Sequence, residues 1–213
     1  MPVFTSLFYF FTQGVVGIAH LLCLNETPEF ALALRKSFSM RKTLSFICVL
    51  VATINCSAQT QVPSAAEVLK PVYAKAAKEN KNVLLIFHAS WCVWCRKMDS
   101  SLHDNAVKPL IDKNYVTTHL SVYESDNKKE LENAGALEML TKLGGADLGI
   151  PYWVVLDKNG KLLADAQNKP GENSGCPATE EEVAHFISVL KKTSSLTEPQ
   201  LKVIEKRFRV NDQ

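Results

Sequence analysis

Most of this sequence of 213 residues has no excess of positive or of negative side chains. Residues 1–58 hold four of the 24 Lys and Arg side chains and two of the 22 Asp and Glu side chains, which leaves 20 of each sign beyond Ala58. That remainder also has no basic stripe with interleaved aromatic residues. The sequence therefore gives no support to a nucleic-acid partner or to an anionic membrane surface as a partner.

Cysteine is scarce in the same part of the chain. Of the six cysteines, only Cys92, Cys95 and Cys176 lie beyond residue 58. A tetrahedral zinc site on the first two would need a second pair of ligands, and the chain offers one further cysteine and scattered histidines. We therefore assign no metal. Internal repeats and low-complexity tracts are missing too, so the composition fits one globular domain with extra segments.

Residues 40–58 have the pattern of a secretory signal peptide. Arg41 and Lys42 form a short positive region, an apolar run follows from Leu44 to Ile54, and Ser57-Ala58 supplies small residues for cleavage. The apolar run is shorter than the roughly twenty residues of a spanning helix. We expect cleavage after Ala58 and a mature chain of residues 59–213 that is periplasmic or secreted, without stable membrane insertion after processing.

Residues 1–39 contain a second apolar stretch, from Val3 to Leu24. Because a complete signal peptide begins at Met40, we interpret residues 1–39 as the product of a misplaced translation start. An N-terminal membrane anchor is the competing interpretation, since the stretch is long enough to span a bilayer. A lipid-modified Cys56 is a further alternative, although Thr53-Ile54-Asn55 fits that motif poorly.

The mature chain alternates between helical and strand patterns, with β-rich segments between amphipathic ones. Helical connections between the first strands predict parallel pairing, and Asp157 to Gly160 predicts an antiparallel hairpin. We predict an α/β three-layer sandwich with a mixed central sheet, helices on both faces and an extra C-terminal helix. The expected helices are 65–80, 92–113 with a possible break, 128–143, 179–192 and 198–209, and the expected strands are 83–89, 115–123, 152–156 and 161–164.

Cys92 and Cys95 directly follow the predicted buried strand and open a helix. A cysteine at a helix N-terminus faces free backbone N–H groups and the positive end of the helix dipole, which favour its thiolate. Cys95 lies one turn further on the same side, with less expected solvent access, and can attack a mixed disulfide on Cys92. We predict that Cys92 is the nucleophile and Cys95 the resolving residue. Metal binding or an inert pair are the alternatives.

Two landmarks together resemble the thioredoxin superfamily. The first is VLLIFHASWCVWCRKM, from Val83 to Met98, and the second is Ile150-Pro151 before a predicted strand. The resemblance covers roughly residues 65–192. It is closest to extracytoplasmic thioredoxin-like thiol:disulfide oxidoreductases such as the C-terminal domain of the bacterial transmembrane disulfide reductase. It implies a thioredoxin-like fold in which a cis Ile150–Pro151 bond faces the disulfide.

We predict a substrate-binding set around the cysteines: Trp91, Val93, Trp94, Ile150 and Pro151. The resemblance implies that Trp91 packs beside the active site and that the backbone of Ile150 binds an extended substrate chain. Trp94 is expected to offer an exposed apolar surface for partners, because exposed aromatic residues are favoured at interfaces. Simpler interpretations are core packing for Trp91 and an ordinary turn for Pro151.

Three features depart from the family pattern. Ile86 occupies the position where thioredoxin has a buried Asp, so proton transfer for Cys95 needs water or another side chain. The region from Glu124 to Gly149 is longer than in thioredoxin, and residues 167–177 form a polar loop. Either insertion could shape a partner site, but solvent-exposed loops are the simpler interpretation.

Thiol–disulfide exchange with protein substrates is the leading functional hypothesis, with an upstream redox partner and no cofactor besides the Cys92–Cys95 disulfide. The residues between the cysteines lack the histidine of strongly oxidising relatives, which favours a reductase or isomerase over an oxidase. The alternative is a non-catalytic module that captures a client protein or Cu(I), with Met98 and His88 as the nearby candidate ligands. We expect Cys176 to be an exposed spectator thiol in a loop, with a regulatory or intermolecular disulfide as the alternative.

Overall fold

The computed structural model describes residues 62–212. The segments interpreted above as a misplaced start and a signal peptide, residues 1–39 and 40–58, lie outside the described residues. Between residues 62 and 212, no helix combines the length and the apolar character needed to cross a bilayer.

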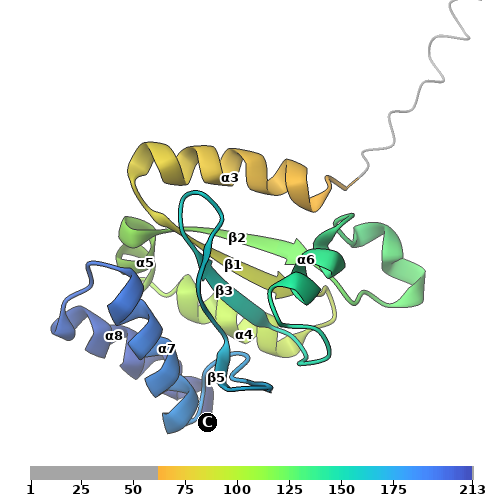
Figure 1. Ribbon diagram of the computed structural model, residues 1–213. Coiled ribbons are helices and arrows are strands. Elements are labelled where there is room, and N and C mark those ends of the chain that lie inside the picture. Colours follow the sequence, from red (N-terminus) through yellow and green to blue (C-terminus); the bar gives the residue numbers. More distant parts are fainter. Residues whose placement is uncertain (1–61, 213) are drawn as a thin grey trace, which may run out of the picture. The chain divides into compact units, whose positions relative to one another are not determined.

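A four-stranded mixed sheet forms the centre of the fold, with the strands in the order β2-β1-β3-β4 (Figure 1). β1 (Asn82–His88) pairs in parallel with β2 (Tyr115–Ser121) and antiparallel with β3 (Tyr152–Leu156). β3 in turn pairs antiparallel with β4 (Leu162–Asp165). The predicted parallel beginning and antiparallel hairpin are therefore confirmed.

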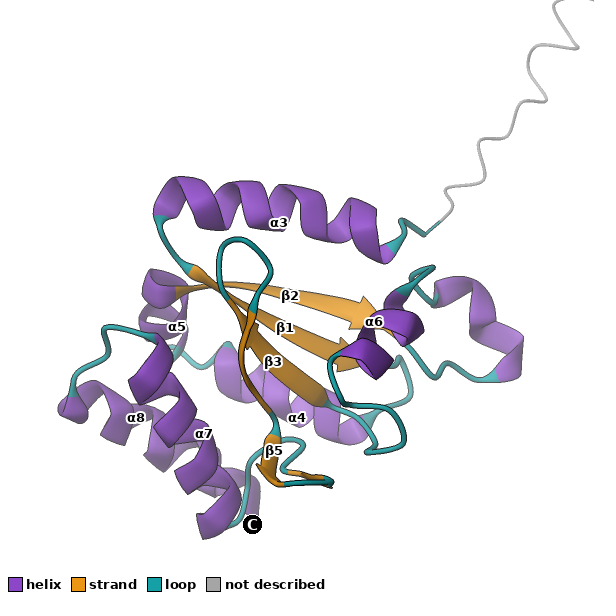
Figure 2. Cartoon of the chain, in the orientation of Figure 1, coloured by secondary structure: helices purple, strands orange, loops and turns teal. Residues whose placement is uncertain are grey.

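Helices cover both faces of this sheet (Figure 2). α3 (Ala65–Glu79) lies across one face, and α4 (Val93–Leu102) and α7 (Glu180–Thr193) lie on the other. The remaining helical elements are α5 (Lys108–Asn114), α6 (Ala136–Lys142), α8 (Glu198–Arg209) and the 3-10 helices η1 (Asp126–Leu131) and η2 (Val210–Asp212). The predicted α/β sandwich with an extra C-terminal helix is confirmed.

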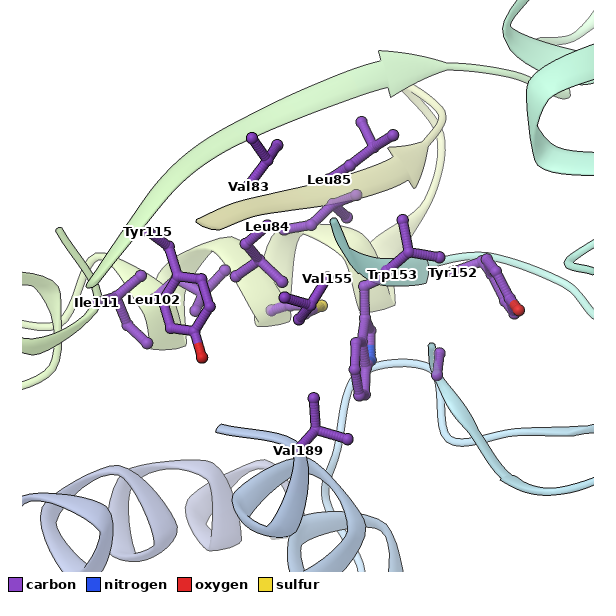
Figure 3. Close-up of a cluster of buried hydrophobic side chains, with 14 of the residues drawn as sticks. Val83, Leu84, Leu85, Leu102, Ile111, Tyr115, Tyr152, Trp153, Val155 and Val189 are labelled. Carbon is purple, nitrogen blue, oxygen red and sulfur yellow. The ribbon is translucent and has the colours of Figure 1, made fainter. Parts of the chain in front are cut away.

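β1 and β3 lie at the centre of the core, because their apolar side chains are covered on both faces of the sheet. All residues from Val83 to Phe87 and from Tyr152 to Leu156 are at most 1% exposed. In Figure 3, Val83 and Leu85 point to one side of the sheet, whereas Trp153 and Val155 point towards Val189 of α7. The segment that follows β1 and carries Cys92 and Cys95 therefore starts from a closely packed, buried strand.

Helix starts follow the capping signals in the sequence. Ser64 and Glu67 form a capping box at the start of α3, and Thr179 and Glu182 form another at the start of α7. In both, the hydroxyl accepts a hydrogen bond from the third helical N–H, and the glutamate accepts one from the cap N–H. These reciprocal bonds satisfy backbone donors that the first helical turn leaves free.

The predicted helix over residues 128–143 is wrong. The chain forms η1, leaves helical geometry, and starts again as α6. Asn133 explains the break, because its Oδ1 accepts from the Ser121 N–H at 2.7 Å and its Nδ2 donates to the Pro63 carbonyl at 2.7 Å. Gly135 then turns the chain with a φ of +84°, which glycine adopts without a steric penalty.

Two further segments bear on the sequence predictions, one in agreement and one not. The possible break in the predicted helix over residues 92–113 is confirmed, because a turn between Leu102 and Lys108 divides it into α4 and α5. The region expected as a polar loop contains a short hairpin, β5 (Gln167–Lys169) and β6 (Glu172–Asn173). That hairpin gives the segment after it a fixed course beside the Ile150–Pro151 loop, as the hydrogen bonds described below show.

Candidate active site

Cys92 is the N-cap residue of α4. Its extended backbone, with φ −73° and ψ 107°, precedes the first helical turn, and its N–H donates to the Ala89 carbonyl at 3.1 Å. The Cys95 N–H points at the Cys92 sulfur at 3.1 Å. A free N–H of the first turn is thus directed at this sulfur, as the sequence analysis expected for a thiolate-stabilising position.

Cys92 and Cys95 form a disulfide, with a distance of 5.3 Å between their Cα atoms. The two residues are 2% and 3% exposed. The expectation that Cys95 has less solvent access than Cys92 is therefore wrong for this disulfide form. Their positions at the helix start distinguish the two sulfurs, since Cys92 caps the helix and Cys95 lies within its first turn.

The Ile150–Pro151 loop faces the disulfide. Its peptide bond is cis, and the Ile150 carbonyl oxygen lies 3.6 Å from the Cys92 sulfur. The Ile150 side chain packs against a small buried cluster of Ala89, Cys92 and Cys95. The fold therefore brings together two sequence landmarks that are 58 residues apart.

Three large apolar side chains around the cysteines are exposed. Trp91 is 54% exposed, Val93 56% and Trp94 48%. The Trp91 indole N–H donates to the Tyr123 carbonyl at 2.7 Å, and the Lys97 ammonium lies 4.4 Å from the centre of the Trp94 ring. Core packing of Trp91 is therefore excluded. Exposed aromatic residues of this kind are enriched at protein interfaces.

The segment that carries this site matches a known protein family. Residues 68–158, which contain both cysteines and the Ile150–Pro151 loop, match the model of a thioredoxin-like family. Over these residues the chain is similar to the thioredoxin-like family. A comparison with curated proteins found no match.

Several solved structures resemble the thioredoxin-like chain. A disulphide isomerase from Xylella fastidiosa Temecula1 is 22% identical, with a TM-score of 0.42 over 75% of this chain and 94% of that one. The oxidised C-terminal domain of DsbD from Neisseria meningitidis is 21% identical, with a TM-score of 0.39 over 62% and 98%. A thioredoxin-fold protein from Helicobacter pylori is 20% identical, with a TM-score of 0.35 over 62% and 84%.

A cleft of about 390 Å³ lies beside the thioredoxin-like redox pair. Trp94, Ile150 and Pro151 form one part of its lining, and residues 173–176 with Ala178 and Thr179 form another. The polar insertion before α7 is therefore more than an exposed loop, because it supplies a wall of the cleft.

Asn173 joins that wall to the Ile150–Pro151 loop. Its Nδ2 donates to the carbonyl oxygens of Leu148, Gly149 and Pro151 at 3.1, 3.2 and 3.1 Å. Its Oδ1 accepts from the Gly175 N–H at 2.9 Å. Asn173 was not predicted from the sequence, because an asparagine in a polar segment carries no local signal of these distant partners.

The residues considered as neighbouring ligands lie inside the fold. Met98 is fully buried in the main core. His88 is half-buried, its Nε2 lies 3.3 Å from the Ser121 hydroxyl, and burial, followed by the neighbouring His119, lowers its pKa. Over residues 62–212, no group of three or more His, Cys, Asp or Glu side chains is arranged to hold a metal ion.

Cys176 is buried, so the expectation of an exposed loop thiol is wrong. It is 5% exposed, and the Asn211 Nδ2 lies 3.4 Å from its sulfur. Burial raises the pKa of this thiol to about 12. Cys176 is therefore a thiol at neutral pH, although its residue lines the cleft.

Ile86 is buried as well, at 1% exposure, in the strand that lies between β2 and β3.

Proposed function

We propose that this protein exchanges disulfides with protein substrates through the Cys92–Cys95 pair. The observation that carries the proposal is a disulfide at the start of α4 that faces the Ile150–Pro151 loop, within 3.6 Å of the Ile150 carbonyl. The match of this segment to a thioredoxin-like family supports it.

The exchange proceeds in two steps, each of which forms one S–S bond and breaks another. The Cys92 thiolate attacks a substrate disulfide, forms a mixed disulfide and releases one substrate thiolate. The Cys95 thiolate then attacks the Cys92 sulfur, restores the Cys92–Cys95 disulfide and releases the second substrate thiolate. Two electrons pass from the cysteine pair to the substrate, and a dithiol redox protein returns them by the same chemistry in reverse.

The substrate-binding surface proposed for this reaction surrounds the disulfide. Trp91, Val93 and Trp94 supply exposed apolar contact area, which suits transient protein partners. Ile150 and Pro151 line the neighbouring cleft, where the backbone of Ile150 can pair with an extended substrate segment.

We further propose that the protein acts as a reductase or isomerase rather than an oxidase, and that it does so outside the cytosol. The absence of a histidine between the two cysteines supports the first proposal. The signal-peptide pattern of residues 40–58 supports the second. A redox potential near −270 mV, about that of thioredoxin, would agree with a reductase, whereas one near −120 mV would indicate an oxidase.

An insulin-reduction assay with dithiothreitol as the electron donor tests the exchange reaction. We expect residues 59–213 to accelerate reduction, and Cys92→Ser to abolish the acceleration. Ser101→Ala is a matched control, because it changes a buried polar residue of the same helix outside the redox pair. Equal rates with the wild type and the Cys92→Ser variant would refute the proposed function.

A further inference from the structure

Glu124 is a buried carboxyl group that the exchange steps above do not use. It lies three residues beyond the end of β2, at the start of the insertion, and is only 4% exposed. Its Oε1 accepts a hydrogen bond from the Ser90 N–H at 2.6 Å, and its Oε2 accepts one from the Ser90 hydroxyl at 2.7 Å. Both oxygens act as acceptors, which is the bonding pattern of an ionised carboxylate.

Ser90 belongs to the turn that carries the redox pair. It precedes Cys92 by two residues, so its Cα lies no more than about 7.6 Å from that of Cys92. The neighbouring residue Trp91 is held by the residue before Glu124, through the bond from its indole N–H to the Tyr123 carbonyl at 2.7 Å. Hydrogen bonds from two adjacent residues of the turn, Ser90 and Trp91, to the Tyr123-Glu124 pair therefore hold this turn in place.

The cations near Glu124 are engaged elsewhere or exposed. Lys129 pairs with Glu132 at 2.9 Å, and Glu132 itself accepts from the Glu124 N–H at 2.8 Å. The Arg96 side chain is exposed and donates to the Ser90 carbonyl at 3.1 Å. His88 has its pKa lowered, first by burial and then by His119, so it is neutral at neutral pH. The negative charge of Glu124 thus faces the turn without a buried cation beside it.

We propose that Glu124 is a positioning residue of the redox pair, which fixes the turn before Cys92 and, by its buried negative charge, disfavours the Cys92 thiolate. This role rests on the proposed function. A charge that destabilises the thiolate destabilises the reduced form relative to the disulfide, and therefore makes the pair more reducing. The redox potential of the Cys92–Cys95 pair would then depend on an acidic residue in the loop after β2. The strand position at which thioredoxin has its buried Asp is occupied here by Ile86.

Glu124→Gln removes the negative charge of this side chain but keeps its hydrogen bonds to Ser90. The amide keeps an acceptor for the Ser90 N–H and a donor for the Ser90 hydroxyl, but it carries no charge. We expect the pKa of the Cys92 thiol to fall by about one unit, the order of magnitude of a partly screened interaction between two like charges. The measurement is the pH dependence of iodoacetamide alkylation of Cys92 in reduced protein, with the modified site assigned by mass spectrometry.

Ser90→Ala changes the same contact in the opposite sense. It leaves the charge in place and removes one hydrogen bond that disperses it, so the pKa of Cys92 should rise by roughly half a unit. A turn that is merely loosened would move the pKa in the same direction in both variants. Glu138→Gln is the control, because Glu138 lies in the same insertion but is exposed and pairs with Lys142; its Cys92 pKa should equal that of the wild type.

Opposite shifts in the two variants support the proposal, and equal or same-direction shifts overturn it. If Glu124→Gln does not fold, no shift or a downward shift in Ser90→Ala still overturns the proposal. Alkylation needs no protein substrate. A protein that fails to reduce insulin but shows the opposite shifts would therefore refute the proposed function and leave the role of Glu124 standing.

Discussion

The hydrogen bonds of Asn173 make it the clearest test of how the fold holds the Ile150–Pro151 loop. Asn173→Ala removes a donor shared by three carbonyl oxygens and an acceptor used by the Gly175 N–H. The amide has two hydrogens for three carbonyls, so about three hydrogen bonds are lost in effect. At roughly 1 kcal/mol each, the free energy of unfolding should fall by about 2–3 kcal/mol.

The substitution should also slow catalysis, because the Ile150 carbonyl would no longer be held beside the Cys92 sulfur. We expect a loss of about tenfold in kcat/KM for insulin reduction, which corresponds to about 1.4 kcal/mol. Urea unfolding followed by tryptophan fluorescence gives the stability change, and the insulin assay gives the rate. The rate is measured well below the unfolding transition, so that loss of folded protein does not contribute.

Asn105→Ala is the matched control, since Asn105 is an exposed asparagine in the turn between α4 and α5. It should change stability by less than about 0.5 kcal/mol and leave the rate unaltered. If Asn173→Ala behaves like this control in both assays, the amide does not hold the loop and the reasoning is refuted.

Three other expectations concern the core, the third thiol and a half-buried histidine. Phe186→Ala, which removes a fully buried ring packed edge-on against Trp153, should lower the free energy of unfolding by about 3–5 kcal/mol, whereas Val203→Ala on the exposed face of α8 should change it little; urea unfolding compares them. Cys176, with its pKa raised to about 12, should stay unmodified by iodoacetamide in native reduced protein at pH 8 and react only after unfolding, and rapid native labelling would contradict its burial. The folded-state pKa of His88 lies below 6.5, so the unfolded chain binds more protons there and the free energy of unfolding should fall as pH drops below about 6.5. In His88→Gln, the urea midpoint should change less between pH 7.5 and pH 5 than in the wild type. An unchanged pH dependence of the midpoint would count against this.

The parts of the site that sequence analysis located depend on local patterns. A continuous apolar strand, a Cys-x-x-Cys pair and a helical run follow each other within residues 83–102, and each restricts its neighbours. The C-terminal helix has the predicted bounds, Glu198–Arg209, and the structure shows Thr197 as its N-cap and basic residues in its last turn.

The parts that could not be predicted depend on contacts between distant residues. Asn133 breaks the expected helix by bonding to a carbonyl 70 residues away, and helical periodicity contains no trace of that partner. Asn173 and Glu124 likewise act on segments 22 to 25 and 34 residues away. Their residue types alone indicated exposed loops, and only the fold shows that one holds the cleft and the other the turn before Cys92.

Trapping of a mixed disulfide on Cys92 tests the central claim most directly. The protein used is residues 59–213 with Cys95→Ser, combined with Cys176→Ala so that no other thiol can resolve the intermediate. Incubated with an oxidised substrate protein, it should form a covalent adduct on a non-reducing gel, with the bond assigned to Cys92 by mass spectrometry. The matching Cys92→Ser, Cys176→Ala variant should form none. An adduct on Cys95 in that second variant, with none in the first, would reverse the roles of the two sulfurs, and no adduct in either would contradict thiol–disulfide exchange by this pair.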